Sequence, residues 1–207
     1  MPGREFLHLL VKRWLNKKKK SRELANLNFK PTFLSPLNLR STVKVGSSSI
    51  LMTHLPGKNH IDEHGQKWKR SIDFDLMSLC EWGAVAVVCL VEKKELSVMG
   101  VPNYFQDIEN FGLMFFHFPI KDMSVPEAPF FSAWKLGGKK LKSLISQDSK
   151  IVLHCAAGLG RTGMVCASLL KQQGYTPQAA IRKVRAARPG AIENIAQEKF
   201  VLTSTLD

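Results

Sequence analysis

The feature that most constrains this chain of 207 residues is the segment Ile151–Gly163, which reads IVLHCAAGLGRTG. Its apolar beginning, Ile151–Leu153, predicts a short parallel strand that is buried on both faces. The residues from Thr162 onward predict a helix. A cysteine and two glycines therefore lie in a tight loop between the end of a buried strand and the beginning of a helix.

The composition of this loop predicts an anion-binding site that contains a nucleophile. Backbone N–H groups converge at a helix N-terminus, where the helix dipole also favours an anion. This position and the nearby Arg161 both favour the thiolate of Cys155, which is the nucleophilic form. Arg161 can bind two phosphoryl oxygens at once through its planar guanidinium. The alternatives are a structural cysteine beside a glycine-rich turn and a nucleotide-binding loop, although the Gly-Lys-Ser/Thr ending of such loops is absent.

The pattern His-Cys, five residues, Arg-Thr-Gly resembles the signature loop of the cysteine-dependent protein tyrosine and dual-specificity phosphatases. Downstream, Ala179–Asn194 with Gln197 and Phe200 looks like the helix, Arg-Pro-Gly turn and final helix of small dual-specificity phosphatases. Upstream segments are similar to the cyclin-dependent-kinase-associated phosphatase family, namely Leu55–Gly57, Cys89–Leu96, Val101–Asn103 and Pro119–Pro126. The resemblance covers about residues 47 to 205.

The loop residues divide into reacting, binding and supporting groups. Cys155 is the expected nucleophile, and Arg161 is expected to stabilise the equatorial phosphoryl oxygens. Thr162 can donate its hydroxyl to the sulfur and so help the thiolate leave, while His154 is expected to hold the orientation of the cysteine. The residues expected to surround the phosphate are Ala156, Ala157, Gly158, Leu159, Gly160 and Arg161.

The family resemblance implies a general acid, an aspartate on a mobile loop before the nucleophile strand. Asp122 fits best, because it follows the apolar stretch Leu113–Ile120, which predicts a strand, and precedes a predicted loop. A turn or helix-capping role is the alternative for Asp122. Asp107 is the second candidate, and Asp148 is interpreted as a turn residue.

These residues predict hydrolysis in two steps without a metal or another cofactor. Cys155 attacks phosphorus while Asp122 protonates the leaving oxygen, and water then hydrolyses the cysteinyl-phosphate with Asp122 as base. The resemblance implies that Gln197 orients this water, but a surface glutamine on a helix is an equal alternative.

The expected substrate is a phosphoprotein carrying phosphotyrosine and phosphoserine or phosphothreonine. In place of the lysines that favour inositol phosphates in related lipid phosphatases, the loop has Ala156, Ala157 and Leu159. A phosphoinositide phosphatase at a membrane surface is the second hypothesis. A catalytically weak phosphate-binding scaffold is the third.

The positive charge of the chain is concentrated at its N-terminus. Residues 1–30 carry nine Lys or Arg and two Glu, which is +7 of a formal net charge of +13. We expect a basic extension over residues 1–40, which could bind an anionic membrane, dock on a protein partner, pack on the catalytic domain or remain a solubilising tail. Residues 41–207 are the expected catalytic domain. The sequence lacks zinc-ligand, helix-turn-helix and RNA-binding patterns, so nucleic acid is an unlikely partner.

A catalytic thiol that must stay reduced, together with no apolar stretch of signal-peptide length, predicts a cytoplasmic protein. Peripheral membrane association and export without a signal peptide stay open. Cys89 closes the apolar run Ala84–Val88, which predicts a central strand parallel to the one before Cys155. We hypothesise that oxidised Cys155 forms a disulfide with Cys89, with a buried inert thiol as the alternative.

The order of predicted elements indicates an α/β fold with a mainly parallel central sheet flanked by helices, as in protein tyrosine phosphatases. The active site then lies beyond the carboxyl ends of the strands. Predicted strands cover 49–53, 84–90, 113–119 and 151–155, and helices begin near 73, 126, 161, 177 and 193. We expect Gly137-Gly138 to split or bend the helix that precedes the nucleophile strand.

Overall fold

A computed structural model describes residues 37, 39–62, 65 and 67–206. The described elements belong to the unit Phe33–Asp207. The charged residues of the predicted basic extension, which lie in residues 1–30, are outside the described part, and the boundary at residue 41 stays a prediction. Within the described ranges, no helix has both the length and the apolar character needed to cross a bilayer.

The centre of the fold is a five-stranded sheet with strand order β1-β2-β5-β3-β4. Three pairs are parallel, and only β1 runs antiparallel to its neighbour β2. The prediction of a mainly parallel sheet is therefore confirmed, whereas β1 was not predicted. The strands are β1 (Thr42–Val45), β2 (Ser48–Thr53), β3 (Ala84–Cys89), β4 (Met114–His117) and β5 (Lys150–His154).

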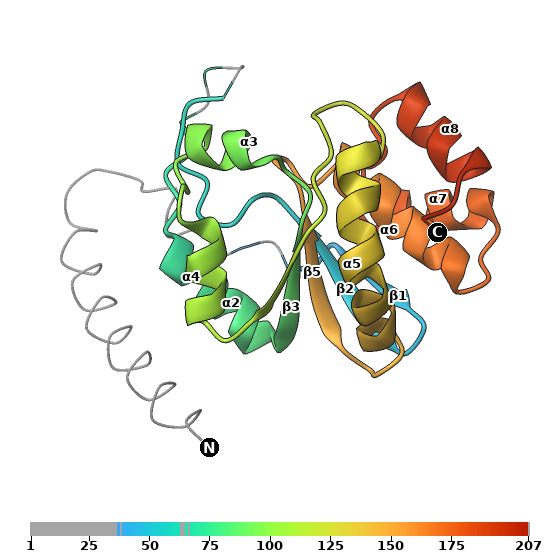
Figure 1. The fold of residues 1–207 in the computed structure, drawn as a ribbon, viewed down its shortest axis with the longest axis horizontal. Helices are drawn as coiled ribbons and strands as arrows, with labels where there is room; N and C mark the ends of the chain where they lie inside the picture. The colour runs from blue at the N-terminus through green and yellow to red at the C-terminus, as the bar shows by residue number, and fades with distance from the viewer. Residues whose placement is uncertain (1–36, 38, 63–64, 66, 207) are drawn as a thin grey trace. The chain divides into compact units, whose positions relative to one another are not determined.

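Helices cover both faces of this sheet (Figure 1). They are α2 (Ile72–Trp82), α3 (Lys93–Val98), α4 (Tyr104–Asn110), α5 (Ala128–Ile145), α6 (Gly160–Gln172), α7 (Pro177–Ala187) and α8 (Ile195–Thr203). α2 and α4 contact β3 and β4 on one face, and α5 and α6 pack on the other. The sequence did not predict α3 and α4, because helices of six and seven residues are too short to show a clear helical period.

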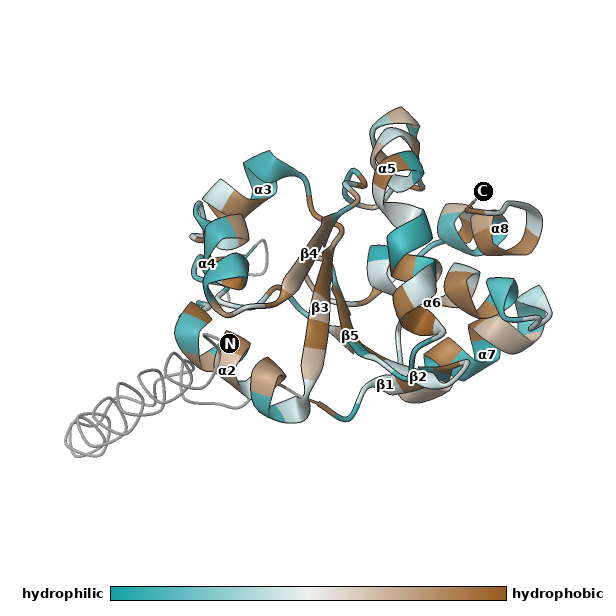
Figure 2. Ribbon diagram, turned by 60° about the horizontal axis from the view of Figure 1, so that its bottom comes forward, coloured by the Kyte–Doolittle hydropathy of each residue, from teal (hydrophilic) through white to brown (hydrophobic). Residues whose placement is uncertain are grey.

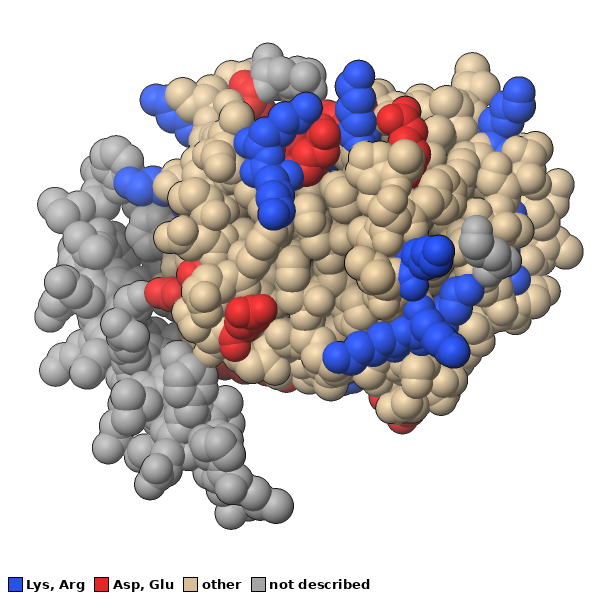
Figure 3. All heavy atoms as spheres, viewed as in Figure 1, with Lys and Arg blue, Asp and Glu red and all other residues tan. Residues whose placement is uncertain are grey.

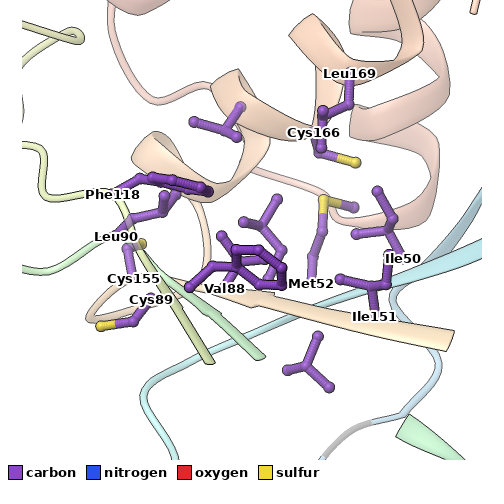
Figure 4. Packing of buried hydrophobic residues seen from close by; sticks show 14 of the residues in the cluster. Ile50, Met52, Val88, Cys89, Leu90, Phe118, Ile151, Cys155, Cys166 and Leu169 are labelled. Atoms are coloured by element: carbon purple, nitrogen blue, oxygen red, sulfur yellow. The ribbon is translucent and has the colours of Figure 1, made fainter. Parts of the chain in front are cut away.

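The strands are largely apolar along their length (Figure 2), as expected for a sheet that is covered on both faces. α6 is buried at every residue from Gly160 to Leu170, because the sheet covers one side and α7 and α8 cover the other. Figure 4 shows Cys166 and Leu169 of this helix facing Ile50 and Ile151 of the strands. The central helix that follows the nucleophile loop is thus fixed by packing on all sides.

The predicted split at Gly137-Gly138 is wrong, because α5 is continuous from Ala128 to Ile145, whereas a bend stays a prediction. The glycines serve packing instead. A Cβ at Gly138 would lie 2.7 Å from the indole of Trp134, and one at Gly137 would lie 3.2 Å from the ring of Phe118. The ring of Phe118 in turn lies 5.0 Å from that of Trp134. The aromatic cluster offsets the low helix propensity of the two glycines.

Lysine and arginine side chains form separate groups on the face shown in Figure 3, one over α5 and another near α3. Acidic side chains lie beside the second group. On this face of the described part, the basic side chains form no single continuous patch.

Candidate active site

The nucleophile loop connects the end of β5 at His154 with the beginning of α6 at Gly160. Cys155 is only 3% exposed, and its sulfur accepts a hydrogen bond of 3.2 Å from the N–H of Gly158. Gly158 has a φ of 75°, and a Cβ there would lie 2.3 Å from the carbonyl group of Thr53. Glycine is thus required both for the backbone conformation and for the close approach of the loop to β2.

Arg161 reaches from the first turn of α6 to two carboxylates. Its guanidinium donates two hydrogen bonds to Glu95, of 2.7 and 2.9 Å, and Nη2 lies 2.8 Å from Oδ1 of Asp122. A further bond of 3.0 Å goes to the carbonyl of Ile120. Burial opposes the charged form, but the hydrogen bonds to Glu95 and the charges of Cys155, Glu95 and Asp122 raise the pKa of Arg161. The guanidinium therefore stays charged beside the loop that contains Cys155.

Glu95 was not recognised from the sequence as a functional residue. It lies on α3, and its Oε2 also accepts a 2.8 Å bond from the N–H of Glu92 in a capping box. Its side chain is 14% exposed and that of Arg161 is 2% exposed, so the pair is nearly desolvated. The spacing of Glu92 and Glu95 is typical of a capping box at a helix N-terminus. The contact between Glu95 and Arg161 is seen only in the fold.

Asp122 lies on the loop after β4, where its carboxylate is 67% exposed and points to Arg161. The two residues that follow are attached to the end of the chain, through bonds from Asn194 to the Met123 carbonyl and from Gln197 to that of Ser124. The carboxylate therefore lies next to the guanidinium of Arg161 and remains open to solvent. This placement is the one that a general acid needs.

The other two aspartates lie elsewhere. Asp107 is on α4, where burial and the charge of Asp73 raise its pKa. Asp148 has a φ of 53° in the turn before β5, at the opposite end of that strand from Cys155. The interpretation of Asp148 as a turn residue agrees with this backbone.

His154 is completely buried directly before the nucleophile. Its Nδ1 lies 3.2 Å from the carbonyl of Cys155, and its Nε2 lies 2.8 Å from the hydroxyl of Tyr104. A carbonyl can only accept, so Nδ1 carries the proton and Nε2 accepts from the Tyr104 hydroxyl. Burial lowers the pKa of His154 to about 3 and keeps the ring neutral. The ring thus supports the backbone of the loop, with Tyr104 as a partner that the sequence did not suggest.

Thr162 is fully buried in the first turn of α6. Its hydroxyl has no hydrogen-bond partner among the described residues, so the expected bond to the sulfur of Cys155 is not formed in this structure. The hydroxyl is a free donor within the helix turn that follows the nucleophile.

Gln197 is fully buried, so the alternative of a surface glutamine is wrong. Its Oε1 accepts from the N–H of Glu193 at 3.0 Å, and Oε2 of Glu193 accepts from the N–H of Gly160 at 2.7 Å. A Cβ at Gly160 would come within 2.8 Å of both side chains. Through Glu193, the amide is thus connected to Gly160 at the end of the nucleophile loop. Through its bond to Ser124 it is also connected to the loop of Asp122.

Arg188 fixes the opposite side of the loop. Its guanidinium donates to the carbonyls of Ala157 at 2.9 Å and Gly158 at 3.2 Å. Binding these carbonyls on the outer side of the loop lets backbone N–H groups face an anion. The N–H of Gly158 points to the sulfur of Cys155, whereas that of Gly160 donates to Glu193. The sequence suggested only a turn role for this arginine, because its partners are 30 and 31 residues away.

Cys89 is a buried free thiol, and burial raises its pKa. It pairs in register with His154, so its side chain lies on the same face of the sheet as that of His154. The side chains of Cys89 and Cys155 point in different directions (Figure 4). Both thiols are free in this structure, and a disulfide between them stays a hypothesis.

Comparisons with known proteins agree with this geometry. Residues 64–175 match the family described as "Polymorphic toxin system, DSP-PTPase phosphatase". Cyclin-dependent kinase inhibitor 3 of Mus musculus is 30% identical over 135 residues, which are 64% of this chain and 63% of that protein. The Rattus norvegicus protein of the same name is 32% identical over 136 residues, with the same coverage. The match thus spans less than two thirds of the length of these relatives.

Solved structures are similar over a larger share of the chain. A kinase associated phosphatase with its catalytic-site cysteine substituted by serine superimposes with a TM-score of 0.71 at 24% identity, covering 81% of this chain and 93% of that one. Tk-PTP in its active form gives a TM-score of 0.55 at 26% identity, with 78% and 93% covered. The fold is that of the protein tyrosine phosphatases, and the chain belongs to the DSP-PTPase phosphatase family.

Proposed function

We propose that this protein is a phosphoprotein phosphatase that hydrolyses phosphotyrosine and phosphoserine or phosphothreonine through a cysteinyl-phosphate intermediate. The observation that carries the proposal is the position of Arg161, which contacts Asp122 at the mouth of the loop that contains Cys155. A nucleophile, a phosphate-binding cation and a proton donor thus come from three separate elements to one place.

In the first step, the sulfur of Cys155 attacks phosphorus, the S–P bond forms and the bond to the leaving oxygen breaks. The loop N–H groups and Arg161 bind the three remaining phosphoryl oxygens, whose charge they stabilise in the transition state. The phosphoryl group competes with Asp122 for Nη2 of Arg161. Its arrival therefore separates the carboxylate from Arg161. Asp122, which is exposed, takes up a proton from solvent and gives it to the leaving oxygen.

In the second step, water attacks phosphorus, Asp122 accepts its proton and the thiolate of Cys155 leaves. The free hydroxyl of Thr162 is the proposed donor to the departing sulfur. Gln197 is the proposed group that orients the water. Its amide is bonded to the backbone of Glu193 and Ser124 and has a second N–H and a second lone pair that could bind the water.

Several features support a phosphoprotein as the substrate. The relatives include kinase-associated phosphatases, and the loop carries alanine and leucine where lysines would favour highly charged inositol phosphates. The comparisons do not favour the phosphoinositide alternative. A cytoplasmic location is part of the proposal, because the reaction needs a reduced thiol.

The test is metal-free hydrolysis of para-nitrophenyl phosphate and of phosphopeptides, with phosphoinositides assayed alongside. Wild type should be active, Cys155→Ser inactive and Asp122→Ala strongly impaired. Asp148→Ala is the matched control, because it removes an aspartate from a loop at the other end of β5. Binding of phosphate analogues without turnover by wild type would contradict the enzymatic function and leave the scaffold hypothesis.

A further inference from the structure

The turn that follows β2 forms a wall of the nucleophile loop. The N–H of Leu55 donates to the carbonyl of Ala156 at 3.2 Å, and Gly158 packs directly on the backbone of Thr53 and His54. The turn Leu55–Lys58 is closed by a bond from the N–H of Lys58 to the carbonyl of Leu55. A side chain at the end of this turn is therefore fixed relative to the phosphate-binding loop.

Lys58 has an unusual environment for a lysine. The residue is 6% exposed, and its Nζ lies 4.2 Å from the ring centroid of Trp68. Its ammonium group has no hydrogen bond and no carboxylate within ion-pair distance among the described residues. A buried charge is normally paired, because its desolvation is otherwise uncompensated. The cation–π contact recovers only part of that cost.

Trp68 is itself held in place. Its indole N–H donates to Asp62 at 2.8 Å, and its ring lies 5.6 Å from that of His54. The ring thus contacts the ammonium from one side, and the described residues provide no acceptor for its N–H donors. Burial lowers the pKa of Lys58, while the charges of Asp62 and Cys155 raise it.

We propose that Lys58, held on Trp68, is a specificity-determining residue that binds a second anionic group of the substrate, a carboxylate or phosphoryl group next to the scissile phosphoryl group. This inference rests on the proposed function. Arg161 is occupied by the reacting phosphoryl group and by Glu95, and Lys58 lies at the end of the turn that contacts the nucleophile loop, so we take it as the partner of a neighbouring anion. The anion supplies the acceptor that the buried ammonium lacks.

The test compares phosphotyrosine peptides that differ in one neighbouring residue. This residue is Glu, Gln or phosphoserine, and it is placed directly before or directly after the phosphotyrosine. Wild type should show a preference of about tenfold in kcat/KM for a charged neighbour over Gln, as expected for a hydrogen bond to a charged group. The Glu and phosphoserine peptides distinguish a carboxylate from a phosphoryl ligand. Lys58→Met should abolish the preference, and Lys58→Arg should retain most of it.

Lys183→Met is the matched control, because Lys183 also lies over an aromatic ring, 5.2 Å from Tyr175, but on α7. It should keep the preference of wild type. No preference in wild type, or an unchanged preference in Lys58→Met, would overturn the proposal. An equal loss on all peptides in Lys58→Met would also overturn it, because a folding role gives that result. If Lys58→Met does not fold, Trp68→Phe, which weakens the hold on Lys58, should reduce the same preference.

Binding of the same peptides to Cys155→Ser separates this proposal from the proposed function. If wild type hydrolyses none of these peptides, the proposed phosphatase function is contradicted. Tighter binding of the charged peptides that is lost on adding Lys58→Met would still support the anion subsite, and equal binding of charged and Gln peptides would overturn it.

Discussion

The nucleophile loop and the loop that carries Asp122 meet at one guanidinium, but they are built differently. Loop 155–159 is held by Arg188, by the backbone after β2 and by Glu193, and its cysteine is nearly inaccessible. The loop after β4 is held at Ile120 by Arg161 and by two bonds from the region of α8, but it presents Asp122 and Met123 to solvent. The difference indicates that phosphate binding is preorganised, whereas the proton donor is free to adjust to the leaving group.

The largest expected effect is on catalysis by Asp122. Asp122→Asn should lower kcat about 10²–10⁴-fold on phosphoserine peptides, because an alkoxide leaving group requires protonation. The loss should be smaller on para-nitrophenyl phosphate, whose leaving group is a weaker base. The free energy of unfolding should change by less than about 1 kcal/mol, because the ion pair with Arg161 is exposed on the aspartate side. An equal loss on both substrates would argue against a proton donor.

The second carboxylate on the same guanidinium should behave in the opposite way. Glu95→Gln should lower the free energy of unfolding by about 3–5 kcal/mol, because it leaves the buried charge of Arg161 without its main partner. Urea denaturation measures this change. Glu198→Gln is the matched control, since Glu198 pairs with Arg185 at the same 2.7 Å but on the surface, and it should cost about 0–1 kcal/mol. Similar losses in both variants would contradict the difference in burial.

The neutral His154 predicts a loss of stability in acid. Its pKa is lowered to about 3 in the folded chain from a usual 6.5, so below pH 6.5 the unfolded chain binds a proton that the folded chain does not. The free energy of unfolding should fall with decreasing pH by about 1.4 kcal/mol per unit over this range, in addition to the contribution of other groups. The slope of the pH dependence should flatten by this amount in His154→Asn. An unchanged slope would mean that His154 ionises in the folded protein.

The smallest expected effect concerns Tyr104. Tyr104→Phe removes the hydroxyl that donates to Nε2 of His154 and should cost about 1–3 kcal/mol in stability, because a buried acceptor is left unsatisfied. If His154 orients the nucleophile loop, kcat should also fall while KM changes less. Phe105→Leu on the same helix is a control for altered packing. If Tyr104→Phe has the kcat of wild type, the bond from Tyr104 to His154 contributes to stability and not to catalysis.

The residues that the sequence predicted best lie close together along the chain. Strand β5, Cys155 and Arg161 fall within twelve residues, so the local sequence pattern is sufficient to predict all three. Glu95, Arg188 and Tyr104 reach the site through contacts between elements 31 to 66 residues apart, which no local pattern shows. The glycine pair in α5 was misread for the same reason, because aromatic packing decided a position that helix propensity alone would break.

Detection of the cysteinyl-phosphate tests the central claim most directly. Wild type is mixed with a phosphopeptide, quenched in acid within the first turnover, digested and analysed by mass spectrometry. We predict a phosphoryl group on the peptide that contains Cys155, and none in Cys155→Ser. Turnover by Cys155→Ser, or product release by wild type without a phosphoryl group on Cys155, would contradict the account.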